Sequence, residues 1–160
     1  MVDADEYRSA LGRFATGVTV VTFAGDDGDH GITVNSFTSL SLDPPLVLWN
    51  CDVEAESHEL LPQAGHYAVN VLASDQEWLS SRFAGEHREM DDPFGDVEFR
   101  RGETGAPLVE GALAYVDCTL EATHDGGDHS IFVGRVEGLG VGDADADPLL
   151  FYEGGYRDIE

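Results

Sequence analysis

The chain has no lysine, and its eight basic residues are all arginines, against 32 aspartates and glutamates. The formal net charge over 160 residues is therefore −24. A surface of this sign cannot neutralise the backbone of a nucleic acid, and anionic lipid headgroups repel it. The composition therefore excludes nucleic acids and membranes as partners.

The same excess of acidic residues also predicts the environment in which the protein works. Like charges repel one another at low ionic strength and destabilise the compact state of a protein. At about 1 M salt the Debye length falls to ~3 Å, so the repulsion is largely screened. We therefore expect a halophilic protein that works in a salt-rich cytoplasm.

Cysteine and long hydrophobic runs are scarce as well. Cys51 and Cys118 have no close spacing that would make a zinc motif or a disulfide framework, so we expect buried free thiols in a reducing compartment. No run of 18 apolar residues occurs, which predicts no membrane span. The acidic start MVDADEYRS lacks the apolar segment of a secretory signal, so a cytoplasmic location is expected.

Short strands make up most of the pattern. Alternating or β-branched apolar residues predict strands at 18–23, 66–72, 112–124, 129–139 and 149–152. The clearest hairpin joins the third and fourth of these strands through the turn DGGD. Residues 86–107 read mostly as a long loop, with a short strand at 97–99, and a loop of that length is more often functional or covered by a partner than idle.

Three helices are expected at the periphery. Residues 3–15 carry an apolar stripe of Tyr7, Leu11 and Phe14 and end at Gly17. A second helix covers 54–61 and ends at Pro62. A third covers 75–83.

The third helix has Asp75 as its cap, with Trp78 and Leu79 facing inward. Antiparallel strands with peripheral helices predict a mainly β, closed or half-closed barrel. No linker divides the chain, so we expect one domain over residues 1–160.

Several familiar site motifs are absent. No G-x-G-x-x-G opens a helix after a strand, which argues against a Rossmann site. Asp143, Asp145 and Asp147 imitate the start of a calcium loop, but its central glycine and closing glutamate are missing. His124 and His129 could meet across the hairpin without a third ligand, so no metal site is expected.

The stretch GITVNSFTSLSLDPPLVL, at residues 31–48, is the most informative segment. It begins as a strand, continues through five small hydrogen-bonding residues around Phe37, and turns at two prolines. Such a segment suits a wall that grips a flat ring system with polar edges, because hydroxyl and N–H groups bind the edges while apolar groups cover the faces. A purely structural serine- and threonine-rich strand before a proline turn is the alternative.

Seven segments together resemble one family. They are ATGVTVVT, GITVNSFTSLSLDPPLVL, YAVNVL, SSRFAG, TGAPLVEGALA, GGDHSIFVGRV and PLLFYEGGYR, which cover nearly the whole chain. In this order and spacing they are similar to the flavin reductase-like proteins, short-chain NAD(P)H:flavin oxidoreductases with an FMN-binding split barrel. The pairing of NSFTSLSLDPP with the later GDH is the most specific part of the likeness.

The resemblance implies an antiparallel split barrel, a homodimer with flavin near the subunit interface, and hydride transfer from NADH or NADPH to FMN or FAD. It also implies a flavin-dependent monooxygenase that receives the reduced flavin. A flavin-binding module that passes electrons without oxidising nicotinamide is the alternative function. A barrel that binds another ligand, such as haem, is a third.

The resemblance also implies roles for individual residues. His129 would face the nicotinamide and act in catalysis. The cofactor-binding residues would be those of the ring edge (Val34, Asn35, Ser36, Phe37, Ser39), the phosphate end (Ser57, Arg82, Phe83) and the terminal mouth (Tyr156, Arg157). Each also has an ordinary structural alternative, such as a core aromatic for Phe83 or a helix-surface residue for Ser57.

The stretch CDVEAESHE after residue 50 departs from the family, which commonly has basic or hydroxyl residues there. Asp52, Glu54 and Glu56 would surround an anionic phosphate, and each pair would repel by roughly 3 kcal/mol at ~6 Å and an effective dielectric constant of about 20. Three alternatives follow. The carboxylates point away, salt screens them, or Arg82, Arg13 or backbone N–H groups hold the phosphate.

Overall fold

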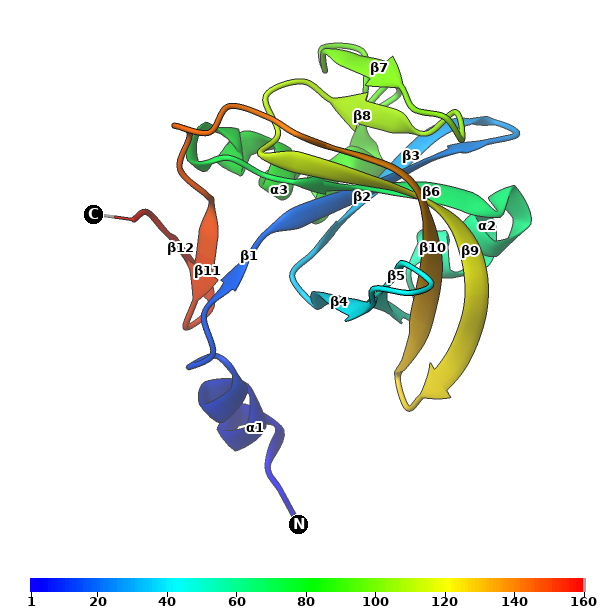
Figure 1. The fold of residues 1–160 in the computed structure, drawn as a ribbon. Helices are drawn as coiled ribbons and strands as arrows, with labels where there is room; N and C mark the ends of the chain where they lie inside the picture. The colour runs from blue at the N-terminus through cyan, green and yellow to red at the C-terminus, as the bar shows by residue number, and fades with distance from the viewer. Residues whose placement is uncertain (160) are drawn as a thin grey trace.

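The computed structural model describes residues 1–159 and is built mainly of antiparallel strands (Figure 1). The strands are β1 (Thr16–Gly17), β2 (Thr19–Gly25), β3 (Gly28–Val34), β4 (Phe37–Ser41), β5 (Leu46–Asp52), β6 (His66–Val71), β7 (Phe99–Arg101), β8 (Pro107–Val109), β9 (Ala114–Gly126), β10 (His129–Val141), β11 (Leu150–Tyr152) and β12 (Gly155–Arg157). The helices are α1 (Ala4–Leu11), α2 (Glu56–Ala64) and α3 (Glu77–Phe83), with 3₁₀ turns η1 (Ser74–Gln76) and η2 (Glu86–Glu89). No helix within residues 1–159 is both long and apolar enough to cross a membrane.

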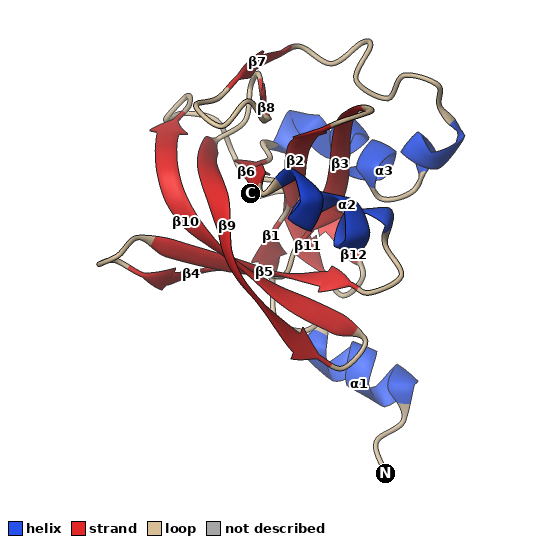
Figure 2. Cartoon of the chain, turned by 90° about the vertical axis from the view of Figure 1, so that its right-hand side faces the viewer, coloured by secondary structure: helices blue, strands red, loops and turns tan. Residues whose placement is uncertain are grey.

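The largest sheet has seven strands in the order β3-β2-β6-β9-β10-β5-β4, and every neighbouring pair is antiparallel. Its edge strands, β3 and β4, are consecutive in the chain and are joined only by Asn35 and Ser36. The sheet therefore curves until its two edges approach each other at that connection, and the long, bent strands β9 and β10 carry much of the curvature (Figure 2). We call these unpaired edges, together with Asn35 and Ser36, the seam. The predicted mainly β, antiparallel architecture with peripheral helices is confirmed.

Strand β2 is buried on both faces. Val21 belongs to an apolar cluster with Trp49 of β5, whereas Val20 belongs to a second cluster with Leu79 and Phe83 of α3. Helix α2 joins the first cluster and α3 the second, and both helices pack against β2 and β3 (Figure 2). The continuous apolar run at 18–23 is the pattern that two-sided burial requires.

Helix α1 is shorter than predicted. The side chain of Asp3 accepts a hydrogen bond from the Asp5 N–H at 2.7 Å, and the helix ends at Gly12 instead of Gly17. It ends early because Thr16 pairs with Phe151 of β11, which requires an extended chain by that point. No residue of α1 is buried, so its predicted apolar stripe has no covering partner within residues 1–159.

The predictions for the ends of the other helices need correction. Pro62 lies inside α2, which continues to Ala64 and ends at Gly65 with a φ of 79°. Asp75 is not the cap before α3, because it lies inside η1 and Gln76 stands at the N-cap position of α3. Trp78 does not face inward and is 47% exposed.

The hairpin β9–β10 and the buried free thiols are confirmed. The long segment after α3 contains more structure than predicted, namely η2, β7 and β8, and the predicted short strand begins at Phe99. Residues after the last predicted strand form β12, which pairs with β11.

Candidate functional site

A cavity of about 750 Å³ opens along the outer edge of β3. Its walls are residues 30–33 with Asn35, residues 54–57 at the start of α2, part of α3 with η2, and two aromatic residues of β11 and β12. Helices α2 and α3 pack on opposite faces of β2 and leave this edge uncovered, so the backbone groups on the outer side of β3 have no strand partner within residues 1–159. Pockets for organic ligands are typically ~300–1,000 Å³ with mixed apolar and polar walls, and this cavity has that size and character.

Gly31 and Phe83 form the apolar wall. A Cβ atom at position 31 would lie 2.8 Å from Phe83 Cδ1, so glycine allows the phenyl ring to lie directly against β3. Below this wall the Thr33 hydroxyl donates to the Ser80 carbonyl at 2.6 Å, and the hydroxyls of Ser80 and Tyr156 lie 2.5 Å apart. These bonds fix β3, α3 and β12 to one another.

Four of the predicted cofactor-binding residues line this cavity. They are Asn35, Ser57, Phe83 and Tyr156, which come from the seam, α2, α3 and β12. Ser57 is only 6% exposed, and its hydroxyl forms no hydrogen bond within residues 1–159. The fold therefore brings together residues that are up to 121 positions apart in the chain.

The other seam residues hold the strands instead of lining the cavity. Val34 is buried in the core, and Phe37 packs against the same cluster. The Ser36 hydroxyl donates to the Asn50 carbonyl at 3.3 Å, and Ser39 is exposed on β4 opposite Val47. Their predicted contacts with a cofactor stay predictions.

The two predicted arginines lie outside the cavity lining. Arg82 forms a bidentate ion pair with Asp96 and donates to the Pro93 carbonyl at 3.0 Å, which docks the following segment on α3. The guanidinium of Arg82 holds the pKa of the Asp96 carboxyl below its ordinary value of 3.8. Arg157 lies 3.8 Å from Glu153.

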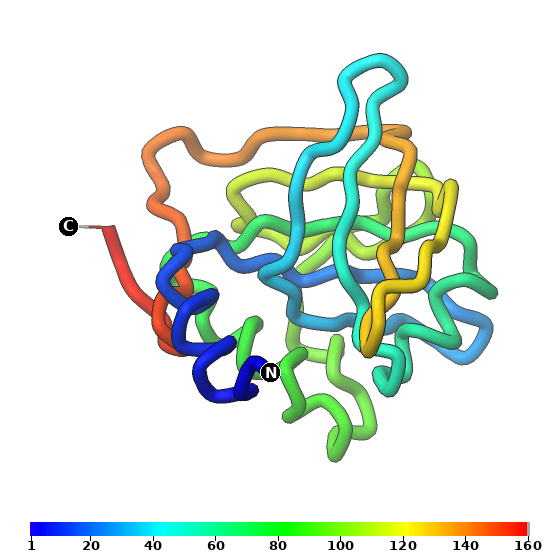
Figure 3. Tube along the Cα trace, turned by 90° about the horizontal axis from the view of Figure 1, so that it is seen from below, coloured from blue at the N-terminus to red at the C-terminus, as the bar shows by residue number. Residues whose placement is uncertain are grey.

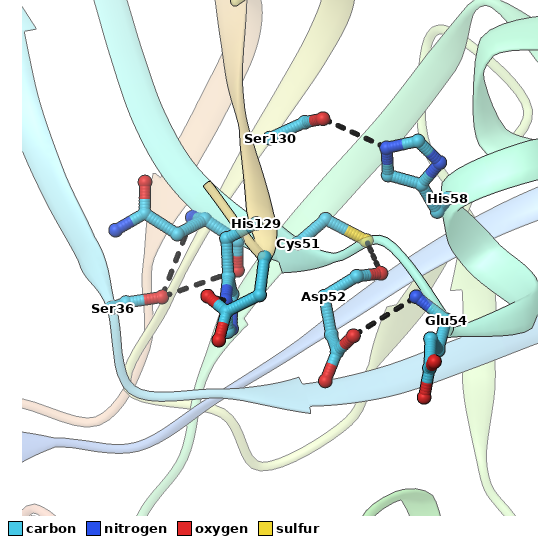
Figure 4. Close-up of polar contacts among 9 residues, drawn as sticks. Ser36, Cys51, Asp52, Glu54, His58, His129 and Ser130 are labelled. Atoms are coloured by element: carbon cyan, nitrogen blue, oxygen red, sulfur yellow. Dashed lines mark hydrogen bonds and ion pairs between the residues drawn. The ribbon is translucent and has the colours of Figure 1, made fainter. Parts of the chain in front are cut away.

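His129 lies at the start of β10, opposite Asp52 of β5, which itself lines the cavity (Figure 4). The His129 side chain is 44% exposed, and its Nδ1 lies 2.8 Å from Asp128 Oδ1. This hydrogen bond holds the pKa of the Asp128 carboxyl below its usual range. His129 is therefore a neighbour of the cavity mouth and not part of the lining.

The next residue ties β10 to α2. Ser130 is buried, and its hydroxyl lies 2.8 Å from His58 Nε2 (Figure 4). His124 stands opposite Ile131 in the hairpin, so it does not face His129 across the strands. Residues 1–159 contain no group of three side chains that could hold a metal ion.

Three carboxylates of the acidic stretch, those of Asp52, Glu54 and Glu56, line the cavity. The carboxylate of Asp52 accepts the Glu54 N–H at 2.9 Å, and Glu56 Oε1 lies 3.9 Å from His30 Nδ1. Of the arginines considered for a phosphate, Arg82 is paired as described, and Arg13 pairs with Glu153 at 3.9 Å.

Among the cavity residues that sequence reasoning did not name as site residues are His30, Ser80, His87 and Arg88. His87 and Arg88 belong to the long segment after α3, whose length was a signal of function without naming a residue. His30 belonged to no predicted site, and Ser80 was one more polar residue of the third predicted helix. Only the packing of α3 beside β3 brings them to one place.

Residues 11–160 match the family described as Flavin reductase like domain. The chain belongs to this family. It is 48% identical over 158 residues to an NADH-dependent flavin reductase of a Rhodococcus species, covering 96% of this chain and 85% of the relative. It is 42% identical over 160 residues to the reductase subunit HsaB of a flavin-dependent monooxygenase of Mycobacterium tuberculosis, covering 99% and 84%.

Solved structures give the same result. The flavin reductase component BorF of a bacterial two-component tryptophan halogenase superposes with a TM-score of 0.91 at 43% identity, covering 98% of both chains. The NADH:FAD oxidoreductase SgcE6 of Streptomyces globisporus, in complex with NAD and FAD fragments, has a TM-score of 0.91 at 39% identity, covering 100% of this chain and 96% of that one. The predicted family and split-barrel fold are confirmed, and the predicted enzyme class is that of these relatives.

The residues present fit a flavin. The open edge of β3 and the Asn35 amide offer donors and acceptors for a polar ring edge, and Phe83 offers an apolar surface for a ring face. Ser57, a residue only 6% exposed, adds a hydroxyl that forms no hydrogen bond within residues 1–159. An apolar face, a polar edge and free hydroxyl and N–H donors are what a phosphorylated ring cofactor requires.

Proposed function

We propose that this chain is an NAD(P)H:flavin oxidoreductase that reduces FMN, or alternatively FAD, by hydride transfer and supplies reduced flavin to a monooxygenase. The observation that carries the proposal is the cavity along the open edge of β3, with Asn35, Ser57 and Phe83 in its walls, in a member of the flavin reductase family. Relatives named as monooxygenase reductase subunits support the partner.

Bound flavin would supply the redox chemistry, by accepting a hydride from the reduced nicotinamide. The protein's part is alignment and electrostatics. The unpaired backbone groups of β3 and the Asn35 amide are placed to bind a ring edge, where donors stabilise negative charge that develops on reduction. Phe83, which lies directly against Gly31, would cover one face of the ring and exclude water there.

The direct test is oxidation of NADH and NADPH with added FMN, FAD or riboflavin in high salt. We expect turnover with FMN and at least one nicotinamide. A protein that binds flavin and receives electrons from a partner, without oxidising either nicotinamide, would be the alternative electron-transfer module and would contradict the proposal.

His129 is proposed to orient the nicotinamide at the cavity mouth. Hydride transfer itself needs no general acid, so orientation is the role that its position beside Asp52 favours. We expect His129→Ala to raise KM for the nicotinamide several-fold while the affinity for FMN is unchanged. Unchanged KM and kcat would remove His129 from the site.

A homodimer is proposed because large apolar side chains are exposed at two projecting elements. Phe14 after α1 is 77% exposed, and Leu42 in the β4–β5 turn, which extends from the body in Figure 3, is 92% exposed. We expect twice the chain mass in light scattering. Phe14→Asp and Leu42→Asp should each shift the protein toward the monomer, and a monomeric wild type would contradict the proposal.

The setting of the enzyme is also a proposal. The net charge of −24 supports a salt-rich environment, and two buried free cysteines are consistent with a reducing cytoplasm. Residues 1–160 are proposed to act as a single domain.

A further inference from the structure

Arg88 differs from every other arginine of the chain. The other seven each form an ion pair with an aspartate or glutamate. Within residues 1–159, Arg88 forms no such pair, although 32 carboxylates are available against eight arginines. It lies on η2 and lines the cavity. An unneutralised cation in so acidic a chain indicates a site that attracts an anionic ligand.

The start of α2, which also lines the cavity, offers a second set of donors. Ala55 stands at the N-cap position and has no side chain that can accept from the helix. The first N–H groups of a helix lack partners within the helix and favour an anion. In α2 the His58 N–H donates to the Ala55 carbonyl at 3.0 Å, which leaves the N–H groups of Glu56 and Ser57 for such a ligand. Ser57 is only 6% exposed, lines the cavity and has a hydroxyl that forms no hydrogen bond within residues 1–159, so it adds a donor at the start of the same helix.

The local charges explain why the cation comes from a distant element. Asp52, Glu54 and Glu56 border the cavity beside α2, and all three are exposed to solvent. They repel an anion at the helix start, so a phosphate there requires a compensating positive charge. No arginine lies in the acidic stretch itself, and Arg88 is the arginine that lines the cavity.

We propose that Arg88, with Ser57 and the first N–H groups of α2, holds the phosphate of the flavin cofactor. This inference rests on the proposed function. The flavin is assigned in preference to the nicotinamide dinucleotide because Ser57 is deeply buried, whereas the nicotinamide would enter over the bound flavin, from the side of the cavity mouth. Arg88 therefore sets the preference for phosphorylated flavins over riboflavin.

The experiment compares FMN with riboflavin, which has the same ring system and no phosphate. Dissociation constants for both are measured by flavin fluorescence at one fixed salt concentration, for the wild type, Arg88→Ala and Arg88→Lys. We expect Arg88→Ala to weaken FMN about tenfold, as loss of a charge-assisted hydrogen bond does, with riboflavin unchanged. Arg88→Lys should recover part of the loss.

Arg100→Ala is the matched control, since Arg100 is exposed, pairs with Glu110 and lies outside the cavity lining. It removes the same charge and should leave both dissociation constants unchanged. Equal effects of Arg88→Ala on FMN and riboflavin, or no effect on either, would overturn the inference. So would a raised KM for NADH with riboflavin as acceptor, because Arg88 would then serve the dinucleotide. Failure of the wild type to oxidise any nicotinamide with any flavin would instead overturn the proposed function.

Discussion

Gly31 determines the shape of the cavity by having no side chain. Phe83 occupies the place where a Cβ would be, and the closest approach would be 2.8 Å. A methyl group here would push the phenyl ring out of a buried apolar cluster and into the ligand space.

We therefore expect Gly31→Ala to weaken FMN binding at least several-fold and to lower the free energy of unfolding by about 1–3 kcal/mol, as overpacking does. Flavin fluorescence titration and denaturant unfolding measure the two effects. Gly17→Ala is the control, because a Cβ at position 17 would meet no atom within 4 Å. Equal behaviour of the two variants would show that Phe83 is free to move.

The thiols give a second prediction for single residues. Burial raises the pKa of Cys51 and of Cys118 to about 12 each. Only the thiolate reacts with alkylating agents, so neither should be modified at pH 8 in the folded protein, and both should react after unfolding. Mass spectrometry after iodoacetamide treatment decides this, and rapid labelling of either cysteine in the native protein would contradict it.

The resemblance to a family named Asn35, Ser57, Phe83 and Tyr156, and the fold brings these four residues to one cavity. It did not find Arg88. An arginine's role depends on which carboxylates lie near it in space, and no local pattern in the sequence records that. Arg82, in the motif SSRFAG, read as a ligand residue, yet the ion pair that it forms is with Asp96, which is remote in sequence.

At the scale of elements, the ion pair between Arg82 and Asp96 attaches the segment after η2 to α3. Arg82 is only 13% exposed, and its hydrogen bond to the Pro93 carbonyl reinforces the attachment. The chain between α3 and Asp96 contains η2 and Arg88. The ion pair anchors the far end of this chain segment on α3 and so keeps Arg88 beside the cavity.

We expect Asp96→Asn to lower the melting temperature at neutral pH. The pKa of the Asp96 carboxyl is depressed below 3.8 in the folded protein. Its stabilising effect is therefore present above that value and is lost as pH falls through the lower, folded-state pKa. The difference in melting temperature between wild type and variant should shrink below pH 3.8.

Asp91→Asn, in the same segment, is the control, since Asp91 has no ion-pair partner within residues 1–159. A difference between wild type and Asp96→Asn that persists unchanged below pH 3 would mean that the pair is not the source of stability.

The helices and strands could be predicted from the sequence where a local pattern determines them. The hairpin β9–β10 was found because its turn is rich in glycine and its strands are long. The ends of α1 and α2 were misplaced, since pairing of Thr16 with β11 and the tolerance of Pro62 in α2 depend on the rest of the fold. The closure of the sheet at the seam could not be predicted either, because it depends on all seven strands together.

At the scale of the whole molecule, charge is the dominant feature. Seven of the eight arginines are neutralised locally, so the excess of carboxylates is spread over the surface without partners. Unscreened repulsion among these groups opposes compactness.

We therefore expect the free energy of unfolding to be higher in 2 M KCl than in 50 mM KCl. Denaturation by urea, an uncharged denaturant, measures it without adding ions. Potassium chloride is chosen over sulfate, because sulfate also strengthens apolar burial by exclusion from the surface. A variant that changes Glu6, Glu59, Glu77 and Glu89 to glutamine removes four exposed, unpaired charges and shifts the formal net charge from −24 to −20. The free energy of unfolding of this variant should depend less on salt than that of the wild type. Equal stability of the wild type at both salt concentrations would contradict the prediction, because it would show that repulsion among the carboxylates does not measurably destabilise the fold.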